Sequence, residues 1–85
     1  MSKTIHSLAQ QALVAALARM RKEMGLSQMT LAERLHCHQS MIARIESGER
    51  RIDVVELVII ARAIGVSPHA VLTEVVPHIG DDLRL

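Results

Sequence analysis

Hydrogen-bonding side chains gather on one face of the segment from residue 39 to residue 47. At about 100° per residue, a helix here places four small or polar residues on one side, namely Gln39, Ser40, Ala43 and Arg44. The opposite side is apolar and consists of Met41, Ile42 and Ile45. Glutamine forms paired hydrogen bonds to the edge of adenine, and arginine forms them to the edge of guanine. Serine can bond to either base, and alanine leaves room for a thymine methyl group. These are side chains that read a DNA major groove, although a merely solvated helix face has a similar composition.

Two further helices are predicted before this segment. The first has one apolar stripe, at Leu13, Leu17, Met20 and Met24. It ends at Gly25, because glycine readily adopts the left-handed conformation of a helix C-terminus. Ser27 offers a hydroxyl N-cap to a second helix of about two turns. The third helix then runs from about Gln39 to Ser47 and stops at Gly48.

Two helices are predicted after it. Asp53 and Glu56 have the spacing of a capping box and a glycine follows the run, so we interpret the β-branched stretch Val54–Ile64 as a helix rather than a buried strand. Ser67-Pro68 begins a fifth helix, since proline suits the first helical position, and Pro77 ends it. Residues 1–85 are therefore expected to form a single all-α domain of five helices.

The composition excludes several classes of function. No residue is aromatic, so the stacking platforms that RNA-recognition modules use are missing and RNA is not an expected partner. The single cysteine cannot form an internal disulfide, and neither an export signal nor a membrane-spanning stretch is recognisable, so we expect a cytoplasmic protein without a membrane partner. No catalytic triad or phosphate-binding loop is found, which predicts no enzymatic activity and no cofactor.

A metal site is considered for three adjacent side chains, His36, Cys37 and His38. Alternating neighbours in a tight turn rarely converge on one ion, and no second cluster completes four ligands. We therefore predict no metal site and interpret Cys37 as a small core residue.

Charge is unevenly distributed along the chain, although the formal net charge is only +1. Residues 19–51 carry seven basic and four acidic side chains, whereas residues 52–85 carry two basic and five acidic ones. This asymmetry suggests that one end of the molecule meets an anion and the other does not.

Three stretches of the chain resemble the helix-turn-helix proteins of the phage repressor and Cro type, the Xre-like family. They are GLSQMTLA at residues 25–32, SMIARIESGER at residues 40–50, and Leu57 together with ARAIGVS at residues 61–67. The likeness extends over about residues 13–76. It implies a compact five-helix, repressor-like DNA-binding domain whose second and third helices form the helix-turn-helix, at about residues 28–47, with the third helix in the major groove.

The resemblance also implies contacts for individual residues. Gln39, Ser40, Ala43 and Arg44 match the base-reading face. Gln28 matches a glutamine that binds a backbone phosphate, and Arg50 and Arg51 lie on a loop that touches phosphates. From the residues alone, Gln28 could instead be an ordinary helix-starting residue, and the two arginines could belong to a solvated loop.

Glu46 lies at the edge of the apolar face of the third helix and so needs a partner. The family commonly pairs this glutamate with an arginine, here Arg21, which implies a structural ion pair. Two positions depart from the family pattern. His36 stands where the family often has a glycine in the turn, and His38 replaces the Ser or Thr that caps the third helix. We therefore expect that the turn is either modestly strained at His36 or different from the turn of the family, and we hypothesise a DNA contact for His38.

Specific binding by one small domain usually needs two copies on half-sites about 34 Å apart, so we expect a homodimer on a palindromic operator. Residues 67–85 are rich in apolar side chains and belong to the acidic half of the chain. We predict that they form the dimer surface, with the alternative that they only close the core of one chain. The residues expected at that surface are Val71, Leu72, Val75, Val76, Ile79 and Leu83.

The expected function is that of a sequence-specific regulator of transcription that binds double-stranded DNA, either a homodimeric repressor or a small autoregulating controller. An antitoxin-type protein, which binds a toxin partner and autoregulates its operon, is the alternative. A third class is a DNA-binding module without sequence preference.

Overall fold

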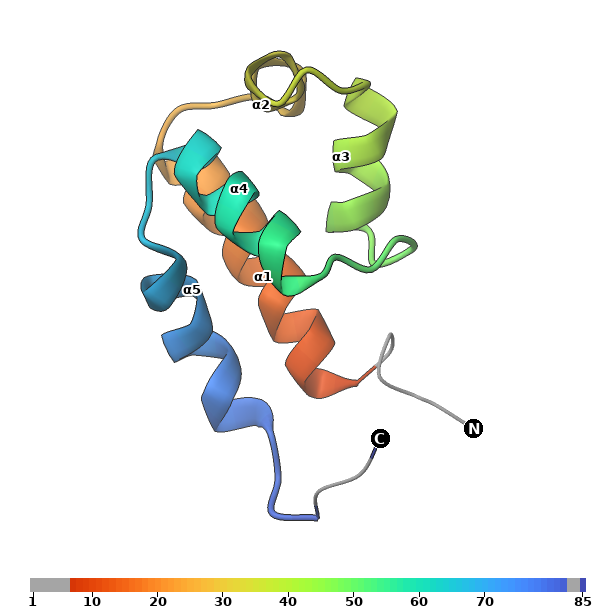
Figure 1. Cartoon of the computed structure of the whole chain (residues 1–85), viewed down its shortest axis with the longest axis vertical. Coiled ribbons are helices and arrows are strands. Elements are labelled where there is room, and N and C mark those ends of the chain that lie inside the picture. Colours follow the sequence, from red (N-terminus) through yellow and green to blue (C-terminus); the bar gives the residue numbers. More distant parts are fainter. Residues whose placement is uncertain (1–6, 83–84) are drawn as a thin grey trace.

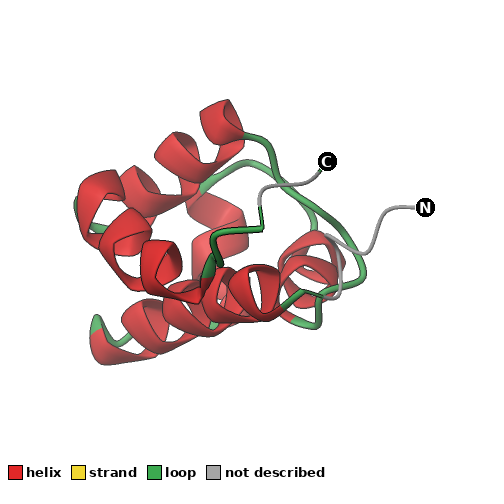
Figure 2. Cartoon of the chain, turned by 90° about the horizontal axis from the view of Figure 1, so that it is seen from below, coloured by secondary structure: helices red, strands yellow, loops and turns green. Residues whose placement is uncertain are grey.

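The computed structural model describes residues 7–82 and 85 of the chain, and within them the predicted all-α fold is confirmed. This part holds no strand and five α-helices: α1 (Leu8–Glu23), α2 (Gln28–Arg34), α3 (Gln39–Glu46), α4 (Val54–Ile64) and α5 (Pro68–Val75). A short 3-10 turn, η2 (Val76–His78), contains Pro77 and continues α5. Figure 2 shows the helices joined by short loops.

Local signals begin α2 and α4 and end α4 where the sequence predicts, whereas α5 ends at Val75, two residues before the predicted Pro77. The amide of Glu56 donates to the Asp53 carboxylate at 2.7 Å and the amide of Asp53 donates to Glu56 Oε1 at 2.9 Å, which confirms the capping box. Ser27 Oγ accepts from the amide of Thr30 at the start of α2. Gly65 ends α4 with a left-handed φ of 99°. The start of α2 and both ends of α4 are therefore fixed by residues that are close to them in the chain.

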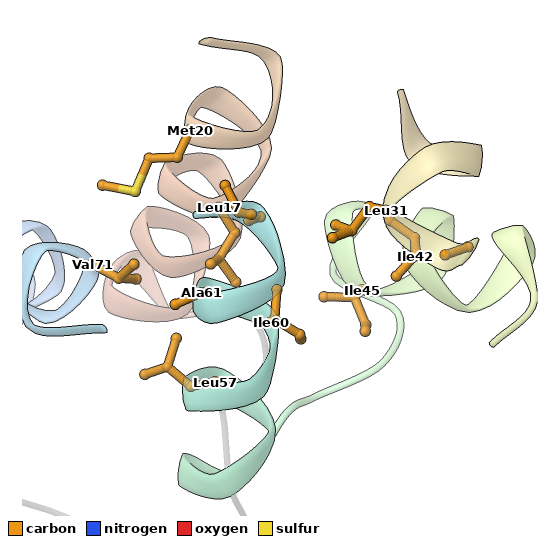
Figure 3. Close-up of a cluster of buried hydrophobic side chains, with 11 residues drawn as sticks. Leu17, Met20, Leu31, Ile42, Ile45, Leu57, Ile60, Ala61 and Val71 are labelled. Atoms are coloured by element: carbon orange, nitrogen blue, oxygen red, sulfur yellow. The ribbon is translucent and has the colours of Figure 1, made fainter. Parts of the chain in front are cut away.

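α1 is the central element of the fold. It contacts α3, α4 and α5, and α2 in turn packs on α3 and α4. In Figure 1, α3 and α5 lie on opposite sides of α1 and α4, and the close-up in Figure 3 shows the same order. Side chains from all five helices fill one core, including Leu17, Leu31, Ile45, Ile60 and Val71. This core holds the helix-turn-helix pair against α1 and α4.

Val71 corrects one part of the predicted dimer surface. Its side chain is fully buried in the core of a single chain, so it has no area left to contact a second copy. Leu72, Val76 and Ile79 are exposed and Val75 is partly buried. Leu83 lies outside the described residues.

The turn between α2 and α3 contains the expected left-handed residue. His36 has a φ of 54°, the one positive φ of a non-glycine residue in the described ranges. A left-handed conformation is unfavourable for a side chain with a Cβ atom, so the backbone stores strain at this point.

No single helix among the described residues is long and apolar enough to cross a membrane. α4 and the segment Pro68–His78 reach that length only together, and they meet at a bend of 118°.

Candidate nucleic-acid interface

α3 packs its apolar face against the core and presents its polar face to solvent, as the sequence predicts. Ile42 and Ile45 are buried in the core. On the other face Ser40 and Arg44 are exposed, whereas Gln39 and Ala43 are partly buried. The structure therefore brings the four predicted base-reading residues together on the accessible side of one helix.

The N-terminus of α3 carries a histidine. His38 occupies the N-cap position with an extended backbone, but its side chain makes no capping hydrogen bond. The residue is exposed. A helix N-terminus attracts anions through its dipole and its first N–H groups, so a phosphate at this end would find an imidazole beside it.

A buried ion pair ties α1 to α3. Arg21 Nε donates to Glu46 Oε2 at 2.6 Å and Arg21 Nη2 donates to Glu46 Oε1 at 2.9 Å, so the two residues paired in the sequence analysis are in contact. Their side chains are only 7% and 11% exposed. Arg21 Nη1 also donates to the carbonyl of Leu26 at 2.7 Å, which joins the connection between α1 and α2 to the pair. A buried pair needs such additional bonds to offset its loss of hydration.

The contacts of this pair decide the protonation of Glu46. Burial raises the pKa of Glu46, but the hydrogen bonds from Arg21 and Gln28 and the positive charge of Arg21 outweigh burial and hold the pKa below its ordinary value. The hydrogen bond to Glu46 raises the pKa of Arg21. Both groups are therefore ionised at neutral pH.

Gln28 links the ion pair to the base-reading face. Its Nε2 donates to Glu46 Oε1 at 2.9 Å, and its Oε1 accepts from Gln39 Nε2 at 2.6 Å. Because Gln28 begins α2 and Gln39 begins α3, this bond joins the first turns of the two helices. The family resemblance implies that Gln28 binds a phosphate, and it does not indicate the contact with Gln39. No spacing signal identifies two glutamines as partners before the geometry of the turn is known.

The arginines of the loop after α3 have different surroundings. Arg51 is exposed. Arg50 is partly buried, and its Nη2 lies 2.8 Å from Glu56 Oε2 on α4. The hydrogen bond between them raises the pKa of Arg50 and lowers the pKa of Glu56. An arginine that is already paired offers less net charge to a phosphate, so Arg51 is the stronger candidate for a backbone contact.

In the part of the chain that the structure describes, no three His, Cys, Asp or Glu side chains lie close enough together to bind a metal ion. Cys37 is a free thiol that packs, partly buried, against the core.

Comparisons with known proteins agree with this geometry. A family model described as helix-turn-helix matches residues 17–71, which is more than half of the chain. Among solved structures, an XRE-family like protein from Pseudomonas syringae pv. tomato str. DC3000 is 38% identical to the chain, with a TM-score of 0.81; the match covers 92% of this chain and 95% of that one. The chain belongs to the XRE family of helix-turn-helix proteins. No curated protein gives a significant match.

Membership of the XRE family makes the chain a DNA-binding regulator of transcription. The matched stretch contains both helices of the helix-turn-helix, α2 and α3. In this motif the second helix enters the major groove with its N-terminal residues toward the bases.

Proposed function

We propose that this XRE-family protein binds specific sequences of double-stranded DNA as a homodimer and acts as a cytoplasmic repressor or small autoregulating controller. The observation that carries the proposal is the accessible polar face of α3, on which Ser40 and Arg44 are exposed. The hydrogen bond between Gln28 and Gln39 joins the start of this helix to the start of α2. The residues assigned to base reading are Gln39, Ser40, Ala43 and Arg44. Those assigned to the DNA backbone are Gln28, His38, Arg50 and Arg51.

The two groups of residues have separate tasks in this proposal. Contacts to phosphates position the protein on the duplex, whereas contacts to base edges select the sequence. Ala43 lies between the longer side chains of α3 and lets the helix approach the floor of the groove. Since one α3 spans few base pairs, two copies on a palindromic operator supply the remaining specificity.

Selection of binding sites from a random duplex library tests the proposal. On the selected site, Arg44→Ala should weaken binding by about 1–3 kcal/mol, and it should change binding to random DNA much less. The matched control is Arg62→Ala, which removes the same charge from an exposed position of α4, outside the helix-turn-helix. If no site is enriched, or if both variants lose the same affinity on selected and random DNA, base reading by α3 is wrong.

The salt dependence of binding tests the backbone contacts. Arg51→Ala should weaken binding to all sequences alike and reduce the slope of log K against log salt by about one. Arg50→Ala should reduce that slope less, because Arg50 is already paired with Glu56. Equal slopes for the two variants would contradict this ranking.

An antitoxin-type protein is the second candidate function. Three apolar side chains on α4 favour it, since Val54, Val55 and Ile59 are exposed and a protein partner would cover them. Isolation of the chain in a stable complex with a small partner protein would support this function. Tight binding of the selected site by the homodimer alone would support the regulator.

A further inference from the structure

A pocket of about 230 Å³ lies between α3 and α4. Its floor contains Ile45 of α3 and Ile60 of α4, two buried side chains that point toward one another in Figure 3. Its more exposed members, Arg50, Glu56 and Ile59, form the rim. The other lining residues are Leu35, Cys37, Met41 and Ile42. This set of residues is called here the α3–α4 pocket.

The size of the α3–α4 pocket limits what it can hold. An apolar cavity of about 150 Å³ accepts a molecule such as benzene, so a pocket of about 230 Å³ has room for a six-membered ring with a small substituent. Pockets for drug-sized ligands are larger, at about 300–1,000 Å³. The occupant that fits is therefore a compact molecule with an apolar body.

The charges at the rim favour an occupant without charge. Arg50 Nη2 lies 2.8 Å from Glu56 Oε2, and the two side chains are 30% and 36% exposed. Because their opposite charges largely cancel, neither an anion nor a cation gains a net attraction at this rim. An ionised group would also lose hydration against the apolar floor.

Arg50 nevertheless keeps donors for an additional hydrogen bond. Its Nη1 donates to the carbonyl of Arg51 at 2.9 Å and to Glu56 Oε1 at 3.4 Å, and its Nη2 donates to Glu56 Oε2. Among the described residues, Nη2 has no second acceptor and Nε has none. An oxygen of an occupant can therefore accept a hydrogen bond from Arg50 while the pair with Glu56 is kept.

We propose that the α3–α4 pocket binds an uncharged small molecule with an apolar body and one hydrogen-bonding oxygen, such as a cyclic ketone. The body lies against the inner face of α3, and the oxygen accepts from Arg50. Because Arg50 is also assigned to a DNA phosphate, the small molecule and the phosphate compete for the same donors. This competition rests on the proposed function, whereas the pocket itself does not.

The thiol of Cys37 reports whether the pocket is occupied. Cys37 lines the pocket and is the single cysteine of the chain, so iodoacetamide alkylates one thiol. Cyclohexanone at about ten times its dissociation constant leaves about one pocket in eleven empty, and it should therefore slow alkylation by about tenfold. Cyclohexylamine, which is protonated at neutral pH, and cyclohexanecarboxylate have the same ring and should protect the thiol far less.

Arg50→Met tests the hydrogen bond to the occupant, because methionine keeps an apolar stem and donates no hydrogen bond. This variant should bind cyclohexanone about fivefold more weakly. The matched control is Arg51→Met, at an exposed arginine that does not line the pocket, and it should bind cyclohexanone as the wild type does.

Thermal melting confirms that these variants fold, and Ile59→Ser is a second test of the pocket. Ile59 is 51% exposed, so its position tolerates a hydroxyl group, but the pocket loses part of its apolar wall. Ile59→Ser should therefore also weaken the protection of Cys37 by cyclohexanone. The binding site is overturned if cyclohexanone gives no protection up to its solubility, or if the two charged analogues protect equally well.

Fluorescence anisotropy of the selected duplex measures the competition with DNA. Saturating cyclohexanone should weaken the binding of DNA by the wild type severalfold and leave that of Arg50→Met as it is without the ketone. Unchanged DNA affinity of the wild type at full protection of Cys37 overturns the competition for Arg50. If the wild type selects no DNA sequence, the proposed function fails, and the protection of Cys37 still decides whether the pocket binds the ketone.

Discussion

Replacement of Glu46 by glutamine should destabilise the protein strongly, because it removes the negative charge of a buried ion pair. Arg21 would keep its positive charge at 7% exposure after losing a charged fork with bonds of 2.6 and 2.9 Å. The change leaves no cavity, since glutamine and glutamate have nearly the same shape. Loss of one partner of a buried pair costs about 3–5 kcal/mol, and the remaining amide oxygen should reduce this to about 2–4 kcal/mol.

A loss of about 2–4 kcal/mol is a large part of the total free energy of unfolding. A chain of 85 residues has a free energy of unfolding of roughly 4–13 kcal/mol, at roughly 0.05–0.15 kcal/mol per residue. Because 1 kcal/mol moves the melting temperature of a domain this size by about 4–8 °C, E46Q should lower it by roughly 10 °C or more. At temperatures where E46Q is fully folded, its DNA affinity should change far less than that of Arg44→Ala.

Thermal and urea unfolding, followed by circular dichroism, measure this effect. The matched control is Glu74→Gln, which makes the same substitution in the exposed arginine–glutamate fork between Arg19 and Glu74. There the side chains of Arg19 and Glu74 are 48% and 37% exposed, so solvent already screens the pair and its loss should change stability little. If E46Q lowers the free energy of unfolding no more than E74Q does, burial does not strengthen the contribution of the Arg21–Glu46 pair and this prediction is wrong.

The same carboxylate should make the protein sensitive to acid. The pKa of Glu46 is lower in the folded state, so its contribution is complete above the ordinary value of about 4.3 and is lost as the pH falls through the folded value. The urea midpoint of E46Q should therefore fall less steeply below that pH than the midpoint of the wild type. His36→Gly should stabilise the protein by about 0.5–1 kcal/mol, because it relieves a φ of 54°; a lower melting temperature would show that the histidine side chain outweighs the strain. Gly65→Ala should cost about 1–3 kcal/mol, since φ is 99° and the new Cβ would lie 3.2 Å from Met24 Cε; unchanged melting would contradict this.

The boundaries of α4 could be predicted from the sequence because they depend on residues that are close in the chain. The capping box joins Asp53 to Glu56 across three residues, and Gly65 ends α4 through its own conformation. Neither depends on where α4 lies in the fold. The resemblance then supplied the arrangement of the helices, which no local signal contains.

The direction of individual side chains in short helices could not be predicted in the same way. Val71 and Leu72 are neighbouring aliphatic residues, yet Val71 is fully buried and Leu72 is exposed. α5 has only eight residues, too few for its apolar pattern to define one stripe. The positions of α1 and α4, rather than the residues of α5, decide which side of α5 faces the core.

The contacts of long polar side chains were the least predictable part of the candidate site. Glu46 needed a partner because of its place on α3, whereas the bond between Gln28 and Gln39 depends on rotamers and on the turn between two helices. That bond has a functional consequence, since Gln28 touches both Glu46 and Gln39. A residue assigned to the DNA backbone thereby orients a residue assigned to base reading. Loss of Gln28 should therefore alter base preference as well as overall affinity, and its effect should not be additive with the loss of Gln39.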